Sequence, residues 1–205
     1  MEKRMTNRQI AAQETRRKLL EAAKKLVCEK GLVGTSVEEI TKVCGVSSGT
    51  FYTYFKRKED VVFELSREMY QGIYEEAQAH DGAFMERLKF YLVNFSGHIE
   101  RDGLKLCQEW VRNTVDPDLV EAPYNTDKLR MDRDSMKGMI EKGIERGELA
   151  DDTPTDALAG ALVDVIYGEM LCWDMSGGAY SFEERTKEFC DLFLPAMIGP
   201  YLIEK

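Results

Sequence analysis

Apolar residues recur every three or four positions along most of this chain. In the first such segment the apolar residues that would share one helix face are Leu19, Ala22, Ala23, Leu26 and Val27. We find no convincing alternating strand pattern and no hairpin signal anywhere in the 205 residues. The sequence therefore predicts an all-α protein.

Turn-forming residues divide this pattern into about nine predicted helices. Gly31 lies where a left-handed C-cap residue belongs. Ser36 and Glu39 have the spacing of a capping box, and Gly45 would end that short helix. The predicted helices cover roughly 15–30, 36–44, 49–55, 58–73, 83–100, 103–115, 124–147, 155–175 and 181–198.

Composition and charge indicate a globular protein with a basic beginning. Hydrophobic residues make up 43% and charged residues 32%, which suffices for a packed core. Only the polar first dozen residues fit a disordered segment. Residues 1–60 hold 13 Lys and Arg against 8 Asp and Glu, a net charge of +5, whereas residues 61–205 hold 15 against 29, a net charge of −14. A basic head can meet phosphates while an acidic body keeps the molecule off other DNA.

The cysteines and apolar stretches indicate a cytoplasmic protein without a membrane partner. The five cysteines lie at 28, 44, 107, 172 and 190 and form no Cys-x-x-Cys pair, so reduced thiols are expected. No apolar region follows the N-terminus as in a signal peptide. The longest apolar stretch, 157–173, is interrupted by Asp164 and Glu169 and is not a membrane span.

The second and third helices, joined by a Gly-containing turn, have the pattern of a helix-turn-helix. At about 100° per residue, Phe51 and Phe55 lie within roughly 40° of each other and would form the buried face of the third helix. Small and hydroxyl-bearing residues on the opposite face let the backbone approach base edges. That face holds Gly49, Thr53 and Lys56, flanked by Thr50 and Tyr52.

Residues beside this face suit the phosphate backbone. Tyr54 lies near the rim of the buried face, and the cations Lys56, Arg57 and Lys58 supply attraction that is independent of sequence. Ser36 opens a helix whose N-terminus is itself a phosphate site. The same pattern also fits an ordinary short helix with Ser36 as a plain cap, or an adaptor whose head contacts protein.

From about Thr15 to Val62 the sequence resembles the N-terminal domain of the TetR family of one-component transcription regulators. The matching elements are the Gly31 turn, "TSVEEI", "GVSSGTFYTYF" and the Lys58-Glu59-Asp60 step. The match covers about a quarter of the chain. The rest resembles the family only in its helical character, its length and the "ERGEL" at 145–149.

The resemblance implies roles for individual residues. In the family, positions equivalent to Ser48, Gly49, Thr50 and Tyr52 approach bases, and those equivalent to Ser36, Tyr54 and Lys58 contact phosphates. With the residues taken from the helix pattern, the predicted DNA-binding set is Ser36, Ser47, Ser48, Gly49, Thr50, Tyr52, Thr53, Tyr54, Lys56 and Lys58. Three residues depart from the common family pattern: Glu38 in place of a basic residue, Ser48 in place of Lys and Thr41 in place of Ala.

The resemblance also implies an architecture. A DNA-binding domain at 1–57 would precede an effector-binding and dimerisation domain at 58–205. The last two helices would join a homodimer that reads a pseudo-palindromic operator in double-stranded DNA, and a small-molecule effector would release it, with repression as the commoner outcome. The apolar segments 157–168 and 182–197 permit that interface, although they equally suit a monomer core.

An effector pocket would lie among the middle helices, which are rich in aromatic and sulfur-bearing residues. This composition suits an apolar or aromatic ligand, but each residue alone equally suits a core. The candidates are Phe95, His98, Cys107, Trp110, Tyr124, Met136, Tyr167 and Met170.

Other functions have weaker sequence support. A di-iron bundle needs Glu-x-x-His, but the residues three before the two histidines are Ala77 and Phe95. A Cys107–His98 pair has no supporting motif, so neither a cofactor, a metal nor catalysis is expected. A redox sensor on the same scaffold would use Cys172 or Cys190.

Overall fold

The computed structural model describes residues 6–115 and 123–203; of these, the side chains of residues 70, 113–115 and 123–127 are not described. The described residues contain no strand, apart from an isolated bridge between Leu149 and Leu202. They form α1 (Asn7–Lys30), α2 (Val37–Cys44), α3 (Ser48–Tyr54), α4 (Asp60–Ala79), α5 (Phe84–Asp102), α6 (Leu104–Val115), α7 (Pro123–Glu145), α8 (Thr155–Met175), α9 (Phe182–Leu192), α10 (Leu194–Ile198) and the 3-10 helix η1 (Gly199–Tyr201). The all-α prediction is confirmed.

The first helix begins earlier than its apolar pattern indicates. Thr6 caps α1 with a capping box to Gln9, whose backbone N–H lies 3.3 Å from Thr6 Oγ1. Further along, Arg17 pairs with both Glu14 and Glu21 on the helix surface. The capping box and the ion pairs therefore stabilise the first half of α1, which is exposed to solvent and has no apolar face to bury. The expected disorder of the first dozen residues is wrong for residues 7–12, and residues 1–5 lie outside the described part.

The last predicted helix, 181–198, is divided into α9 and α10 at Phe193. Pro195 has no N–H to donate to the carbonyl of Asp191, and its ring would clash with that carbonyl in a continuous helix. The described residues thus contain ten α-helices in place of the predicted nine.

The first three helices form a head around their own core. Its fully buried side chains come from α1, α2, α3 and the start of α4: Leu19, Leu20, Ala23, Ile40, Phe51, Phe55 and Val61. Gly45 ends α2, as predicted, and its conformation is left-handed, with φ 67° and ψ 31°. Gly31 also has a positive φ of 76°, but its ψ of 167° is extended, so it is not a left-handed helical cap.

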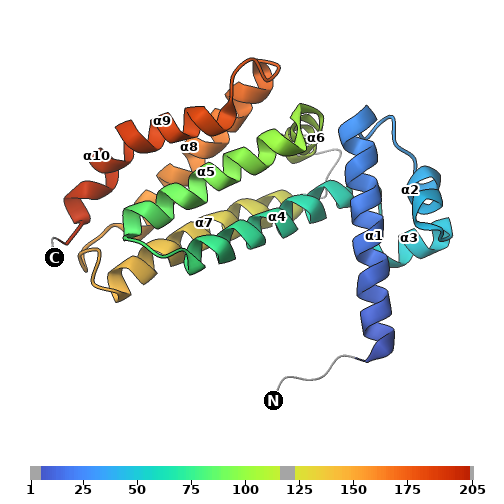
Figure 1. The fold of residues 1–205 in the computed structure, drawn as a ribbon, viewed down its shortest axis with the longest axis horizontal. Coiled ribbons are helices and arrows are strands. Elements are labelled where there is room, and N and C mark those ends of the chain that lie inside the picture. Colours follow the sequence, from blue (N-terminus) through green and yellow to red (C-terminus); the bar gives the residue numbers. More distant parts are fainter. Residues whose placement is uncertain (1–5, 116–122, 204–205) are drawn as a thin grey trace.

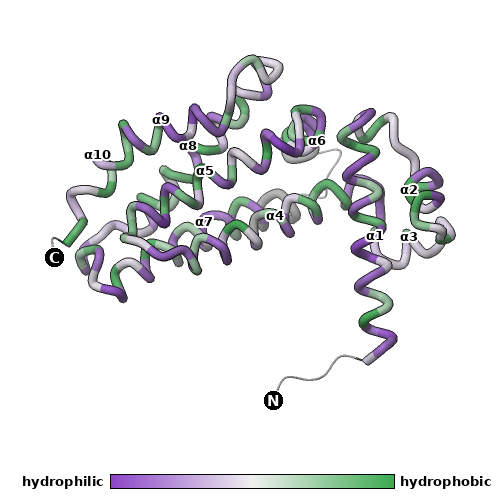
Figure 2. The backbone as a smooth tube through the Cα atoms, in the orientation of Figure 1, coloured by the Kyte–Doolittle hydropathy of each residue, from purple (hydrophilic) through white to green (hydrophobic). Residues whose placement is uncertain are grey.

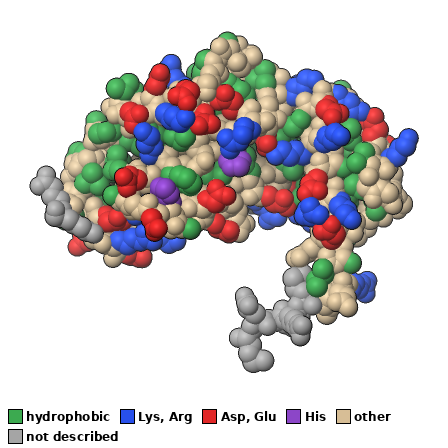
Figure 3. Space-filling model, viewed as in Figure 1, with side chains coloured by type: hydrophobic (Ala, Val, Ile, Leu, Met, Phe, Trp, Pro, Cys, Tyr) green, Lys and Arg blue, Asp and Glu red, His purple; other side chains and the backbone are tan. Residues whose placement is uncertain are grey.

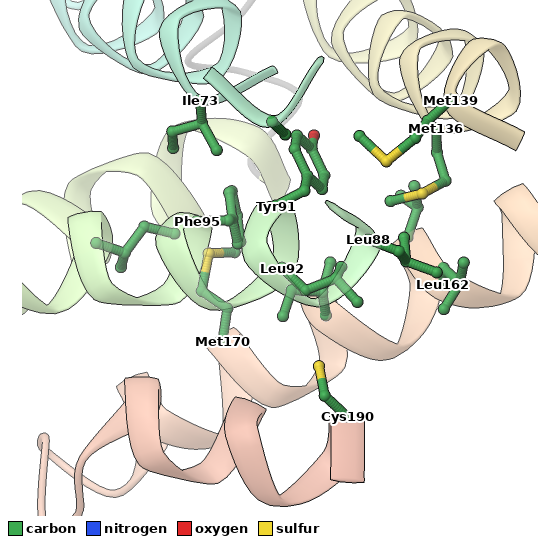
Figure 4. Close-up of a cluster of buried hydrophobic side chains, with 14 of the residues drawn as sticks. Ile73, Leu88, Tyr91, Leu92, Phe95, Met136, Met139, Leu162, Met170 and Cys190 are labelled. Atoms are coloured by element: carbon green, nitrogen blue, oxygen red, sulfur yellow. The ribbon is translucent and has the colours of Figure 1, made fainter. Parts of the chain in front are cut away.

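The remaining helices form a larger body, in which α5 is surrounded by its neighbours (Figure 1). Apolar and polar residues alternate along each body helix in Figure 2, as expected for helices that bury one face. Figure 4 shows the resulting core, with Phe95, Leu92 and Tyr91 of α5 between Met136 of α7 and Met170 of α8.

The head and body meet along α1, α4 and α6. Val61 of α4 belongs to the head core and its neighbour Val62 to the body core. Arg16 of α1 pairs with Glu64 and Glu68 of α4, with 2.7 Å between Arg16 Nη1 and Glu68 Oε1. One helix is therefore packed into both parts. The domain boundary at 57/58 stays a prediction.

Within 6–115 and 123–203, none of the helices combines the length and the apolar character that crossing a bilayer would require.

Candidate nucleic-acid interface and ligand pocket

Two buried phenylalanines set the orientation of α3. Phe51 is 0% exposed and Phe55 is 3% exposed, because both pack into the head core. Ser47 caps the helix, and its Oγ lies 3.2 Å from the Thr50 N–H nitrogen that donates to it. With this orientation the opposite face is open to solvent, and Tyr52 is 57% exposed. The exposed residues of that face are Gly49, Tyr52, Thr53 and Lys56.

The other predicted DNA-binding residues lie beside this face. Ser48, Thr50 and Tyr54 are half-buried. The Thr50 hydroxyl lies 3.0 Å from Ser47 Oγ, and the Thr53 hydroxyl donates to the Gly49 carbonyl at 3.1 Å. These hydroxyls must exchange or share an internal partner to reach a base.

Ser36 begins α2 with a complete capping box. Its Oγ accepts from the Glu39 N–H, and the Glu39 carboxylate accepts from the Ser36 N–H at 2.9 Å. Lys30 also pairs with Glu39 at 2.5 Å. The hydrogen bond to Lys30, followed by the one to the Ser36 backbone, lowers the pKa of Glu39. A DNA phosphate bound at the N-terminus of α2 would therefore lie beside the Glu39 carboxylate.

Lys58 has a structural task that the sequence did not reveal. Its ammonium group donates to the carbonyls of Leu32 at 2.8 Å and Thr35 at 3.1 Å. It therefore holds the loop between α1 and α2 against the start of α4. An ammonium group has three donors, so one remains for a phosphate.

Figure 3 shows Lys and Arg side chains gathered over the head, at the right of the molecule, while the body carries both signs interspersed. Residues 1–60 carry a net charge of +5, so sequence-independent attraction to a duplex favours the head over the acidic body.

A small, mostly apolar pocket lies where α4, α5, α6 and α8 meet, with a cavity volume of about 40 Å³. Four of its lining residues come from the first half of α4. The lining consists of Val62, Leu65, Ser66, Met69, Ile99, Asp102, Leu106, Cys107, Trp110 and Met170.

The predicted effector residues divide between this pocket and the core. Cys107, Trp110 and Met170 line the pocket. Phe95 and Met136, each 1% exposed, lie inside the core instead (Figure 4). Helical spacing alone does not distinguish a pocket wall from a packed interior, which is why the two kinds were grouped together.

Three further candidates lie outside the lining. His98 is half-buried, and burial lowers its pKa. Tyr167 packs edge-to-face on Trp110, with 5.5 Å between ring centroids, and its hydroxyl donates to Asp132. The side chain of Tyr124 lies outside the described part. The sequence prediction also missed the α4 wall, because its residues have the same apolar spacing as core.

Helix α6 contacts the pocket with one face and the head with another. Leu106, Cys107 and Trp110 line the pocket, whereas the buried Glu109 accepts a hydrogen bond from the Leu32 N–H at 3.0 Å. At Gly31, next to Leu32, an added Cβ would lie 3.1 Å from Glu109 Oε1. Gly31 therefore permits both the positive φ and the close approach of α6.

A second link joins the end of α5 to α1. Asp102, which lines the pocket, pairs through its carboxylate with Lys24 at 2.5 Å. The Asp102 carbonyl accepts from the Cys28 thiol at 3.1 Å. The pocket wall thus contacts the head from α4, α5 and α6.

Comparison with known proteins identifies the head. Residues 19–65 match the family model described as bacterial regulatory proteins of the tetR family. The head is of the TetR type. The protein is a DNA-binding transcription regulator, and regulators of this family bind DNA operators and small-molecule effectors.

Several relatives are similar to this protein over almost their whole length. The transcriptional repressor KstR2 of Rhodococcus jostii strain RHA1 is 24% identical over 191 residues, 91% of this chain and 92% of the relative. The structure of Thermus thermophilus FadR with lauroyl-CoA aligns with a TM-score of 0.70 at 23% identity, covering 93% of this chain and 96% of that one. Bacillus subtilis FadR with stearoyl-CoA aligns with a TM-score of 0.64 at 20% identity, covering 86% and 96%. The two structures show a shared fold.

These relatives are regulators and not enzymes. Among the described residues, no three His, Cys, Asp or Glu side chains gather as metal ligands would. The comparisons do not favour the alternative in which the protein is a redox sensor that responds through a cysteine thiol. Of its two candidates, Cys190 is buried and Cys172 is exposed.

Proposed function

We propose that this protein is a repressor that binds a pseudo-palindromic operator as a homodimer and is released when an apolar acyl ligand enters the pocket. The observation that carries this proposal is the position of the pocket. Its wall includes Val62 to Met69 of α4, and the residue before Val62, Val61, is packed into the head core. A ligand that displaces α4 must move the head.

The DNA contact is assigned to the exposed face of α3. Tyr52, Thr53 and Gly49 would approach base edges, because they lie opposite the buried phenylalanines. Lys56 would contact the phosphate backbone, which fixes orientation and adds salt-dependent affinity. Ser36, Tyr54 and the third donor of Lys58 would add phosphate contacts at the rim.

The dimer contact is assigned to α8, α9 and the chain that follows. Leu171, Met175, Leu192 and Phe193 are between 43% and 78% exposed in the single chain. Small residues on the exposed side of α8, namely Ala157, Ala161 and Gly168, would permit close helix approach. Such a set of large apolar side chains is costly to leave in water and marks an interface.

The ligand class is inferred from the lining and the relatives. The FadR proteins of Thermus thermophilus and Bacillus subtilis were solved with lauroyl-CoA and stearoyl-CoA. Here the lining is apolar apart from Ser66, Asp102 and the single polar atoms of Cys107 and Trp110. A hydrocarbon chain gains about 0.8 kcal/mol for each CH₂ group that it buries in such a site.

The mechanism is a shift between two populations. The ligand would favour a conformer in which α4 and α6 have moved, so that the two heads no longer fit successive grooves. A near-complete release, from about 99% to about 1% of the competent form, requires that the ligand prefer the second conformer by about 5.5 kcal/mol.

Selection of bound fragments from random DNA, followed by fluorescence anisotropy on the selected sequence, tests this function. We expect two half-sites with centres about 34–36 Å apart or a multiple of that spacing. Adding lauroyl-CoA should weaken the operator complex. No preference for any fragment at moderate salt would refute the DNA-binding role. Acyl-CoA that binds without weakening the complex would refute the release mechanism.

A further inference from the structure

One buried donor in the pocket has no acceptor. Trp110 is 8% exposed and lines the pocket, and its Nε1 has no hydrogen-bond partner within the described residues. The only other tryptophan, Trp173, donates its Nε1–H to the Tyr180 carbonyl at 2.8 Å. Native proteins leave few buried donors unpaired, and each such group calls for an explanation.

Neighbouring groups do not supply the missing acceptor. The ring of Tyr167 stands at 76° to the indole of Trp110, and a ring face is at best a weak acceptor. The Tyr167 hydroxyl is engaged with Asp132.

The other polar groups of the lining are already paired. Ser66 donates to the Phe63 carbonyl at 2.9 Å, and the Asp102 carboxylate pairs with Lys24 at 2.5 Å. Apart from the weakly bonding thiol of Cys107, the indole N–H of Trp110 is thus the donor that the lining can offer to a guest.

We propose that Trp110 donates a hydrogen bond to an uncharged oxygen on the effector, and that this contact selects apolar chains or rings carrying a carbonyl, ether or hydroxyl over plain hydrocarbons. This inference rests on the proposed function, because it takes the pocket to be the effector site. This class of effector excludes ligands that would place a carboxylate in the pocket. The one carboxylate in the lining, Asp102, would repel it, and the lining contains no cation to pair with it.

The test compares ligands that differ in one oxygen. The probes are lauroyl-CoA, its thioether analogue S-dodecyl-CoA, and a series of oxododecanoyl-CoAs with the ketone at successive chain positions. In the wild-type protein, one oxygen position should improve affinity about five- to ten-fold over the matched ligand without that oxygen, as expected for one net hydrogen bond. Isothermal titration calorimetry measures each affinity.

Replacing Trp110 by its isostere 3-benzothienylalanine removes the N–H and keeps the shape. This replacement should abolish the advantage of the oxygen while leaving the affinity for the matched hydrocarbon ligand unchanged. Trp110→Phe should act in the same direction, and both proteins must keep the helical circular dichroism of the parent. The matched control is Trp173→Phe, whose indole lies outside the pocket and should retain the advantage.

The inference is overturned if the advantage of the oxygen survives in both Trp110 variants, or if no oxygen position gives any advantage while the ligands still bind. If no acyl-CoA of the series binds at all, the acyl ligand class of the proposed function fails, and the inference fails with it. Because the two failures give different titrations, one experiment distinguishes them.

Discussion

Lys58 combines a structural contact with a predicted DNA contact. Its ammonium group holds the carbonyls of Leu32 and Thr35, so Lys58→Ala should lower the stability of the head by about 1–2 kcal/mol as well as weaken all DNA sequences. Thermal unfolding and anisotropy against specific and random duplexes measure the two effects.

The matched control for that variant is Lys56→Ala. Lys56 is exposed, and no hydrogen bond or ion pair to it occurs in the described part of the chain. The Lys56→Ala variant should bind DNA more weakly, and the slope of log affinity against log salt concentration should fall by about one, while the melting temperature stays unchanged. A Lys58→Ala protein as stable as the parent would contradict the structural role.

Tyr52 is the large side chain on the exposed face of α3. We expect Tyr52→Ala to reduce operator preference by about 1–3 kcal/mol, because it removes contacts to base edges and not to the phosphate backbone. The ratio of specific to random-sequence affinity is the measurement. An equal loss on both duplexes would place Tyr52 on the backbone instead.

The buried thiols should be unreactive in the folded protein. Burial raises the pKa of Cys107 and of Cys190 to about 12. Only the thiolate reacts with alkylating agents and peroxide, so the reaction rate should stay low at pH 7–9 and rise only as the pH approaches about 12. Mass spectrometry after iodoacetamide treatment checks this. Rapid native modification of Cys190 that also altered DNA binding would revive the redox-sensor hypothesis.

Helix α6 is the clearest physical link between ligand and head. Glu109→Ala leaves the buried Leu32 N–H without its acceptor, at a cost of about 1–3 kcal/mol. Ligand affinity should change little, because Glu109 does not line the pocket, but the ligand should release DNA less effectively. The measured quantity is the ratio of operator affinities without and with lauroyl-CoA.

Two variants serve as controls for this link. Glu109→Gln retains an acceptor oxygen and should preserve more of the ratio than Glu109→Ala. Glu141→Ala removes an exposed carboxylate of α7 and should leave the ratio unchanged. If Glu109→Ala and Glu109→Gln both keep the parental ratio, the coupling does not run through this contact of α6.

The proposed dimer depends on exposed apolar side chains at the end of the chain. Leu192 is 70% exposed and Phe193 is 56% exposed. Leu192→Asp and Phe193→Asp should each shift the protein towards monomer in analytical ultracentrifugation, because a carboxylate would be desolvated in the interface. Operator affinity should fall in parallel, since one head alone reads half a site.

Met131→Asp is the matched control, because Met131 of α7 is 48% exposed and lines a surface hollow formed by residues of α4, α5 and α7, with none from α8 or α9. It should leave the oligomeric state unchanged. A parent protein that sediments as a monomer would refute the proposed interface without affecting the DNA-binding role of α3.

Local sequence patterns predicted most of the helices, because capping boxes, terminating glycines and the three- to four-residue spacing of apolar residues are each encoded within a few residues. They placed Ser36, Gly45, Phe51 and Phe55 correctly. They failed at the solvated start of α1, which has no apolar stripe, and at Phe193, where Pro195 breaks the helix. The sequence also could not separate Trp110 from Phe95, since both have apolar helical spacing.

Short-range spacing and one contiguous motif were enough to predict the helical class, the orientation of α3 and the TetR-like head. The packing of whole helices was needed to show which apolar side chains surround a pocket, which Trp lacks a partner, and that Lys58 and Glu109 hold the same loop. The hydrogen bonds that hold this loop join residues from 23 to 77 positions apart. Their geometry depends on how whole helices pack, which no local pattern specifies.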